Sequence, residues 1–284
     1  MIKKILSKKD ILWVIIWFLG IITLTLWDIF FLNKPAFRMV IAGFFNTILI
    51  AFMVSIFTLA IAWIITLVIY YLENYKKLTL YMIVVFILNL IRSIPQIIGI
   101  LFGYIGIAAL IQSGKITNNF VIFLLLAICI SIFVFIEVVD LLRDRISHFK
   151  KLDFYNAMRV CGISEFRIIN FDIFWKNSRI HLLNKLISVF GAAIFLLCSV
   201  DFIISVGLST DVNAVTLPPT LGSLLAKIDS KQDILFIGYV LTHPQNITSL
   251  FFEHLFGITV AFSIVFTLMC IYHIANGFAE RHRL

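Results

Sequence analysis

Six long apolar runs constrain the fold of this chain more than any other feature. They cover residues 11–32, 39–72, 78–111, 120–142, 180–208 and 250–277. A bilayer core about 30 Å thick needs roughly 20 apolar residues per helical span, so each run is long enough to cross it. Lipid offers no partners to open backbone groups, and the alternation of barrel strands is absent. The sequence therefore predicts an all-α, polytopic membrane protein with six transmembrane helices.

The composition excludes a soluble enzyme. Hydrophobic residues make up 62% and charged residues 13% of the 284 positions, whereas soluble domains have roughly 45–50% and 25%. The first run follows the basic start MIKKILSKKD. It is too long for a signal-peptide core and has no small-residue cleavage site, so we expect it to remain as the first helix.

Basic residues gather on one side of the expected bundle. With the N-terminus in the cytoplasm, the cytoplasmic segments 1–10, 73–77, 143–185 and 278–284 hold 17 of the 23 Lys and Arg residues. The external segments hold five, and the one that remains, Arg92, lies within a run. The positive-inside rule therefore predicts that both termini are cytoplasmic. Membrane orientation also accounts for the net charge of +8, so we do not expect a nucleic-acid partner.

The sequence offers little for catalysis or metal binding. Its six histidines show no HxxxH or HExxH spacing, and no serine has a G-x-S-x-G context. A GxxxxGK[ST] phosphate loop is also missing. We expect a non-enzyme with no cofactor, metal site or disulfide framework of its own, in which any ATP is hydrolysed by another subunit. The four cysteines lie far apart, at Cys129, Cys161, Cys198 and Cys270.

A short amphipathic segment stands out in the long cytoplasmic connection. Asp153 suits the N-cap of a helix and Gly162 suits the position just past its end. The spacing predicts a helix of about two turns, roughly 12 Å long. Such a helix either docks on another protein or lies on the membrane interface, and the periodicity alone leaves both open. Its apolar stripe, at i, i+3, i+4 and i+7, is formed by Phe154, Ala157, Met158 and Cys161.

This segment resembles the cytoplasmic "EAA" loop of ABC-importer permeases. The form D-Y-x-E-A-A-R-x-x-G-x-S of the dipeptide, oligopeptide and nickel group is matched at Asp153, Ala157, Arg159, Gly162 and Ser164. Further resemblances flank the loop. They are Ser93-Ile94-Pro95, Asp140-Leu141-Leu142-Arg143, Pro218-Pro219-Thr220-Leu221-Gly222-Ser223-Leu224-Leu225-Ala226 and His243-Pro244.

The resemblance implies a divergent permease with a type I importer fold. Residues 1–38 would form the cytoplasmic start, first helix and short external loop. Residues 39–284 would form the permease core, with a coupling loop at 143–179 and an external loop at 209–249. In that family the loop forms a coupling helix that sits in a cleft of the ATPase subunit. The resemblance assigns ATPase coupling here to Asp153, Phe154, Ala157, Met158, Arg159, Cys161, Gly162 and Ser164.

The same resemblance implies partners, cargo and location. The partners would be ABC ATPase subunits that bind the ATP, a second permease chain and an extracytoplasmic substrate-binding protein. The location would be the bacterial plasma membrane, and the cargo short peptides or nickel and metal-chelate complexes. Three positions depart from the family pattern, namely Asn156, Met158 and Trp175. The alternative from another class is an ATP-independent channel or secondary carrier.

Three residues within the apolar runs are candidates for the pathway or for a helix break. Arg92 lies in the third run, three positions before Pro95. Proline breaks a helix, so Arg92 either lines a cavity, pairs at the break or reaches the interface. Asp201 interrupts the fifth run near its outer end. It is either a functional intramembrane acid or a solvated one.

Three further patterns predict packing. Glu137 and Asp140 are one helical turn apart, with Arg143 and Asp144 next, and we expect i, i+3 and i, i+4 pairing among these four residues. Gly99 and Gly103 form a GxxxG, which is typical of close helix packing. In the external connection, Pro218 and Pro219 precede an apolar stripe, which predicts a short helix that lies on the outer surface. The resemblance implies an alternative, in which this loop helps to meet the substrate-binding protein or to gate the entrance.

Overall fold

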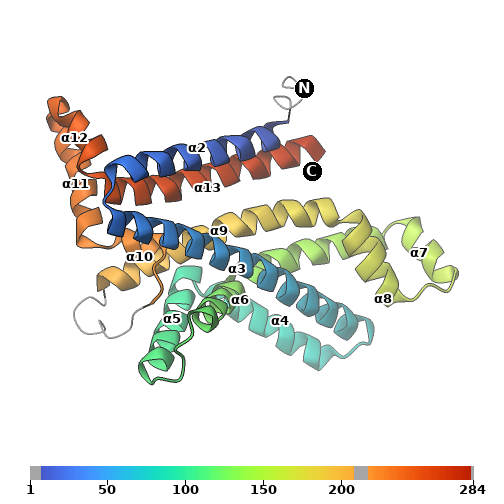
Figure 1. Ribbon diagram of the computed structural model, residues 1–284. Helices are drawn as coiled ribbons and strands as arrows, with labels where there is room; N and C mark the ends of the chain where they lie inside the picture. The colour runs from blue at the N-terminus through green and yellow to red at the C-terminus, as the bar shows by residue number, and fades with distance from the viewer. Residues whose placement is uncertain (1–7, 208–216, 283–284) are drawn as a thin grey trace.

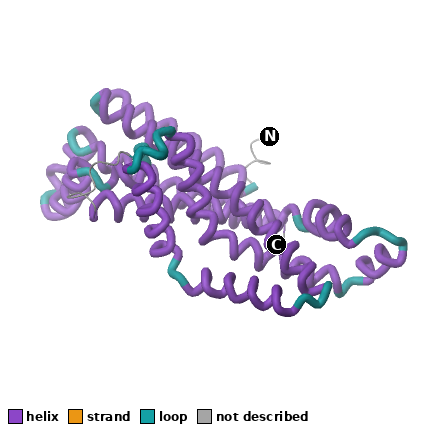
Figure 2. The backbone as a smooth tube through the Cα atoms, turned by 90° about the horizontal axis from the view of Figure 1, so that it is seen from below, coloured by secondary structure: helices purple, strands orange, loops and turns teal. Residues whose placement is uncertain are grey.

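The computed structural model describes residues 8–207 and 217–282, and all regular secondary structure in these two ranges is helical (Figure 2). Part of the external connection, residues 208–216, lies outside the described residues. The helices are α2 (Lys9–Phe31), α3 (Lys34–Asn74), α4 (Leu78–Ser93), α5 (Gln96–Gln112), α6 (Asn119–Lys150), α7 (Asp153–Val160), α8 (Glu165–Arg167), the π-helix η1 (Ile168–Asn177), α9 (Arg179–Gly207), α10 (Leu221–Leu225), α11 (Ile228–Thr242), the 3₁₀ helix η2 (Pro244–Asn246), α12 (Ile247–Phe252) and α13 (Leu255–His282).

Five of the described helices, α2, α3, α6, α9 and α13, are each long and apolar enough to cross a membrane. The pair α4 and α5 passes the same test together, which gives six spans if the pair is one broken span. The apolar run over residues 78–111 is thus divided into two helices, which meet at an angle of 95°.

Pro95 explains the position of this break. Proline has no backbone N–H and pushes the residue before it out of the α region. Ile94 is accordingly extended, with φ −83° and ψ 125°, and Pro95 is the N-cap of α5. The prediction that Pro95 marks a helix break is confirmed.

The GxxxG of α5 faces α6. A Cβ added to Gly99 would collide with the ring of Phe133, and one added to Gly103 would collide with Cys129 Sγ. Both neighbours belong to α6. The prediction of close helix packing at these two glycines is therefore confirmed.

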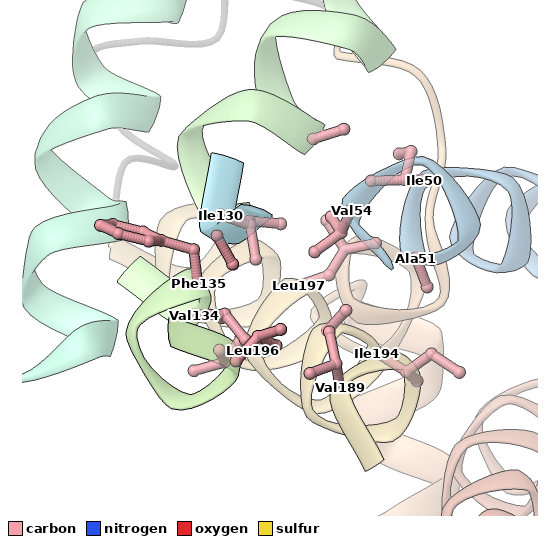
Figure 3. Packing of buried hydrophobic residues seen from close by; sticks show 14 of the residues in the cluster. Ile50, Ala51, Val54, Ile130, Val134, Phe135, Val189, Ile194, Leu196 and Leu197 are labelled. Atoms are coloured by element: carbon pink, nitrogen blue, oxygen red, sulfur yellow. The ribbon is translucent and has the colours of Figure 1, made fainter. Parts of the chain in front are cut away.

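The core of the bundle lies where α3, α6 and α9 pack against one another (Figure 3). Val54 from α3, Ile130 from α6 and Leu197 from α9 are fully buried there. In contrast, α2 packs almost entirely on α13, and only 6% of its most apolar window is buried. The two helices therefore form a pair on the side of the bundle, as Figure 1 shows.

The start of α2 and the end of α13 lie close together at one end of the bundle (Figure 1). Lys9 Nζ lies 2.7 Å from Glu280 Oε2, and Arg281 Nη1 lies 2.6 Å from Asp10 Oδ2. This end also carries α7 and α8 (Figure 1). We call it the α7 end; α10, α11 and α12 lie at the opposite end.

Candidate functional site

The short helix predicted in the long connection is present as α7, although its first residue differs from the expectation. Asp153 is not the N-cap; Leu152 is, with an extended backbone and no side-chain capping bond. Asp153 instead occupies the first turn, where a carboxylate is favoured by the positive end of the helix dipole. A leucine at the N-cap leaves the first N–H groups without a side-chain acceptor, so packing must hold this end of α7.

Gly162 ends α7 as the sequence predicts. Its φ is +76°, in the left-handed region that glycine adopts without steric cost. The Gly162 N–H donates to Arg159 O at 3.0 Å, and the Ile163 N–H donates to Met158 O at 3.1 Å. These two bonds form a Schellman motif, which satisfies carbonyl groups that the end of the helix would otherwise leave open.

Most of the predicted apolar stripe of α7 faces away from the protein. Phe154, Ala157 and Cys161 are exposed, and only Met158 packs on the core. The residue that attaches the helix is Tyr155, which is 4% exposed and which the stripe did not include. Within the described residues α7 thus has an outward apolar surface beyond the ends of α3 and α6.

A hydrogen-bonded network joins α7 to the end of α3. The hydroxyl groups of Tyr70 and Tyr155 lie 3.0 Å apart. Glu165 Oε2 accepts from the Tyr70 hydroxyl at 3.2 Å and from Asn74 Nδ2 at 3.0 Å. The other carboxylate oxygen of Glu165 lies 3.4 Å from Arg159 Nε. Sequence reasoning missed this network because its members lie up to 95 positions apart, although two tyrosines at the end of an apolar run are a recognisable interfacial signal.

The chain returns from α7 to α9 through α8 and the ten-residue π-helix η1. Ser164, exposed, precedes α8, and its carbonyl accepts from Ile168 N at 3.1 Å. Trp63 of α3 donates its indole N–H to Asn170 Oδ1 at 2.6 Å and packs edge-on against Phe174. Trp175, where the resemblance expects proline, is 65% exposed. A second set of contacts with α3 therefore holds this return segment.

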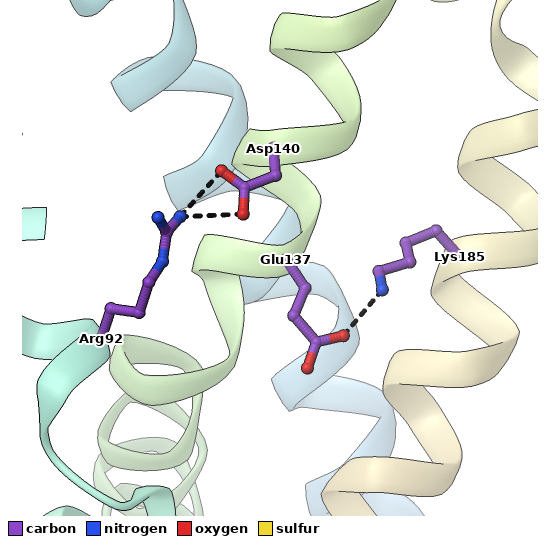
Figure 4. A network of polar contacts seen from close by, with 4 residues as sticks. All are labelled: Arg92, Glu137, Asp140 and Lys185. Atoms are coloured by element: carbon purple, nitrogen blue, oxygen red, sulfur yellow. Dashed lines mark hydrogen bonds and ion pairs between the residues drawn. The ribbon is translucent and has the colours of Figure 1, made fainter. Parts of the chain in front are cut away.

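Arg92 lies in the last turn of α4, just before the break, and pairs with Asp140 of α6 (Figure 4). One guanidinium nitrogen lies 2.9 Å and 2.8 Å from the two carboxylate oxygens. Glu137 pairs instead with Lys185 of α9, at 2.7 Å. The predicted pairing along α6 with Arg143 and Asp144 is therefore wrong, because oppositely charged groups of neighbouring helices come within reach of both acids.

Asp201 is buried, not solvated. It is 5% exposed and accepts a hydrogen bond from the Thr220 hydroxyl, and Thr220 caps α10 through a capping box. The phenol of Tyr104 also lies beside the Asp201 carboxyl group. Asp201 thus holds the start of α10 against α9, and this contact gives it a structural role.

The expected surface helix after Pro218 and Pro219 is instead inserted in the bundle as α10. Leu221 and Leu224 are 1% and 0% exposed. The Leu221 N–H donates to Thr47 Oγ1 of α3 at 3.0 Å. Gly222 packs against the backbone of Cys198, where any side chain would collide. The prediction of a location on the outer surface is therefore wrong. It failed because the sequence pattern cannot distinguish burial in lipid from burial between helices.

Among the described residues, no group of three or more His, Cys, Asp or Glu side chains is placed to hold a metal ion. The predicted residues lie in three separate places: the α7 surface, the break between α4 and α5 with Arg92 and Pro95, and the buried contact of Asp201 with Thr220. No protein-family model matches the chain, and no curated protein matches it either.

Proposed function

We propose that this chain is the permease subunit of an ATP-driven importer and that α7 is its docking element for a separate ATPase subunit. The observation that carries the proposal is the outward apolar surface of α7, formed by Phe154, Ala157, Val160 and Cys161, on a helix held by polar bonds to the end of α3. Val160 is 89% exposed. So short a helix needs a docking surface, and its anchor leaves this surface free for a partner.

The contacts of α7 suggest how movement would pass to the spans. A push on α7 acts on α3 through Tyr155 and Glu165, and on α9 through α8 and η1. Closure of two ATPase subunits on ATP would thus shift helices of the bundle and change access to a pathway between this chain and a second permease. In this scheme α7 and the helices attached to it have two positions, and ATP bound at the ATPase subunits shifts the equilibrium between them.

The other parts of the proposal rest on the resemblance. The second permease is a different chain, an extracytoplasmic binding protein delivers the cargo, and the complex lies in a bacterial plasma membrane with both termini of this chain in the cytoplasm. The cargo is a short peptide or a nickel or metal-chelate complex. No catalytic step is assigned to this chain.

The proposal is tested by purifying the tagged chain from its native membrane in mild detergent and identifying the proteins that accompany it. We expect an ATPase subunit with the unaltered chain. Ala157→Arg places a charge on the outward surface of α7 without changing its buried side, so it should abolish the association. Asn276→Arg adds the same charge at an exposed position of α13, and should retain the ATPase.

Two results would contradict the proposal. One is the absence of any ATPase with the unaltered chain in several mild detergents. The other is equal loss of the ATPase in both variants, which would mean that added charge and not the α7 surface matters. The first result would favour an ATP-independent channel or carrier, in which α7 rests on the membrane interface. The second would leave the ATPase as a partner but would remove α7 as its docking element.

A further inference from the structure

The helix α2 buries only two side chains, and both are aspartates. Asp10 is 6% and Asp28 is 2% exposed, while the other side chains of α2 are half-buried or exposed. Asp10 pairs with Arg281. Asp28 accepts a hydrogen bond from the Thr259 hydroxyl at 2.8 Å and forms no ion pair within residues 8–207 and 217–282. One buried acid of α2 is therefore balanced by a base, and the other is not.

Asp28 lines a cavity of about 150 Å³ between α2, α3 and α13. Three hydroxyl-bearing side chains, Thr25, Thr259 and Ser263, line the same cavity, and no basic residue of the described chain does. A water molecule takes up about 30 Å³ in the liquid, so the cavity has room for a small ion and a few waters. The rest of its lining is aliphatic and aromatic, which makes an unbalanced charge there costly.

Ser263 provides a second observation. Its side chain is 2% exposed, and its hydroxyl group has no hydrogen-bond partner among the described residues. The hydroxyl groups of Thr25 and Thr259, in contrast, each donate a hydrogen bond. Because Ser263 lines the cavity, its free hydroxyl group keeps surface toward the cavity. The Ser263 oxygen is therefore available to a ligand there.

The adjoining ends of α2, α3 and α13 line a second cavity, of about 320 Å³, which is polar. Three carboxylates and one ammonium group border it, from Asp229, Asp233, Glu253 and Lys227. A cleft lined mainly by charges of one sign raises the local concentration of counter-ions. This acidic cavity therefore attracts cations to the end of α2 that carries Asp28.

We propose that the cavity at Asp28 binds one Na⁺ ion, held by the Asp28 carboxylate and the Ser263 hydroxyl, with water completing its coordination. One carboxylate without a base requires one positive charge, and hard cations prefer carboxylate, hydroxyl and water oxygens. The cavity is smaller than the roughly 300–1,000 Å³ of sites for organic ligands, which favours an inorganic ion. The ion would join α2 to α13. This inference goes beyond the proposed function and does not depend on an ATPase at α7.

The test is equilibrium dialysis of radiolabelled Na⁺ against the full chain in lipid nanodiscs, at mildly alkaline pH and with N-methylglucamine chloride as the background salt. We expect saturable binding of one ion per chain. Asp28→Asn keeps an acceptor for Thr259 but removes the charge, and should abolish the binding. Ser263→Ala should weaken it about tenfold, because one oxygen ligand is lost. Asp10→Asn removes the other buried acid of α2 and should retain the binding.

Thermal stability separates binding from folding. Na⁺ should raise the melting temperature of the unaltered chain, because a ligand of the folded state stabilises it, and should not raise that of Asp28→Asn. Without Na⁺, Asp28→Asn should be as stable as the unaltered chain or more stable, since it removes an unbalanced buried charge. Asp10→Asn leaves Arg281 unpaired and should lower the melting temperature while it keeps the response to Na⁺.

Three results would overturn the inference. The first is the absence of saturable Na⁺ binding to the unaltered chain, which would mean that a proton neutralises Asp28. The second is binding that survives in Asp28→Asn. The third is equal loss of binding in Asp28→Asn and in folded Asp10→Asn, which would mean that the ion responds to the total charge of α2 and not to this cavity.

Discussion

The hydroxyl groups of Tyr70 and Tyr155 lie 3.0 Å apart and join two helices whose contact residues are 85 positions apart in the chain. Both rings are buried. This bond, together with those of Glu165, makes the end of α3 the direct support of α7, which has no capping side chain at its own start.

Removal of the Tyr155 hydroxyl should loosen α7. Tyr155→Phe keeps the ring and loses one buried bond, at a cost of about 1 kcal/mol. We expect hydrogen exchange of the α7 amides to become roughly fivefold faster. Tyr70→Phe loses the bond to Glu165 as well and should have a larger effect. Tyr75→Phe, at an exposed ring, is the control, and equal exchange in all three variants would contradict the supporting role.

The cost of substituting Gly162 should depend only on how easily the new residue adopts its backbone conformation. A Cβ there meets nothing within 4 Å, so only its φ of +76° opposes a side chain. Gly162→Ala should cost about 1–2 kcal/mol in the stability of α7, and Gly162→Asn less, because asparagine tolerates this region better. Hydrogen exchange of the α7 amides ranks the stability of α7 in these two variants. Gly106→Ala, in open space within α5, should be neutral or stabilising, and a loss as large as that of Gly162→Ala would refute the argument.

A methyl group at position 222 should displace α10. The Cβ of Gly222→Ala would lie 2.6 Å from Cys198 Cα, and backbone cannot yield as a flexible side chain can. We expect the buried Cys198 thiol to react faster with a maleimide, measured in a chain whose other three cysteines are alanine. Gly238→Ala, where a Cβ meets nothing within 4 Å, should leave the rate unchanged. Unchanged labelling in Gly222→Ala would mean that α10 is not packed on Cys198.

Reversing the charge of either Arg92 or Asp140 should lower thermal stability, and swapping both charges should restore it. Both side chains are about half exposed, so the pair contributes less than about 1 kcal/mol after solvent screening. Arg92→Asp and Asp140→Arg each place like charges together and should lower the melting temperature, and the double variant should recover most of the loss. Two additive losses, without recovery, would show that the pair does not hold α4 against α6. Lys9→Ala is the control and should change the melting temperature little, because its pair with Glu280 is more exposed.

Local features of the fold were predictable from the sequence. Apolar runs indicated the positions of the long helices, Pro95 the break, and Gly162 the end of α7, because each depends on backbone sterics or on the length of a bilayer-spanning helix. Run length alone could not predict the 95° bend. Its direction depends on how α5 packs on α6 and α9.

Partners distant in the chain were not predictable. Asp140 was expected to pair within its own helix, but its partner is Arg92, 48 positions away. The Asp201 carboxyl and the Thr220 hydroxyl meet only because α10 enters the bundle. Periodicity finds an apolar face without identifying what covers it, so the burial of α10 required the arrangement of all its neighbours.

The pairing of α2 with α13 has a consequence for biosynthesis. Asp10 and Asp28 of α2 take their partners, Arg281 and Thr259, from a helix that the ribosome makes after every other described helix. Until α13 is made, both acids of α2 lack these partners. A chain that stops before α13 would therefore lack both contacts and the helix on which α2 mainly packs.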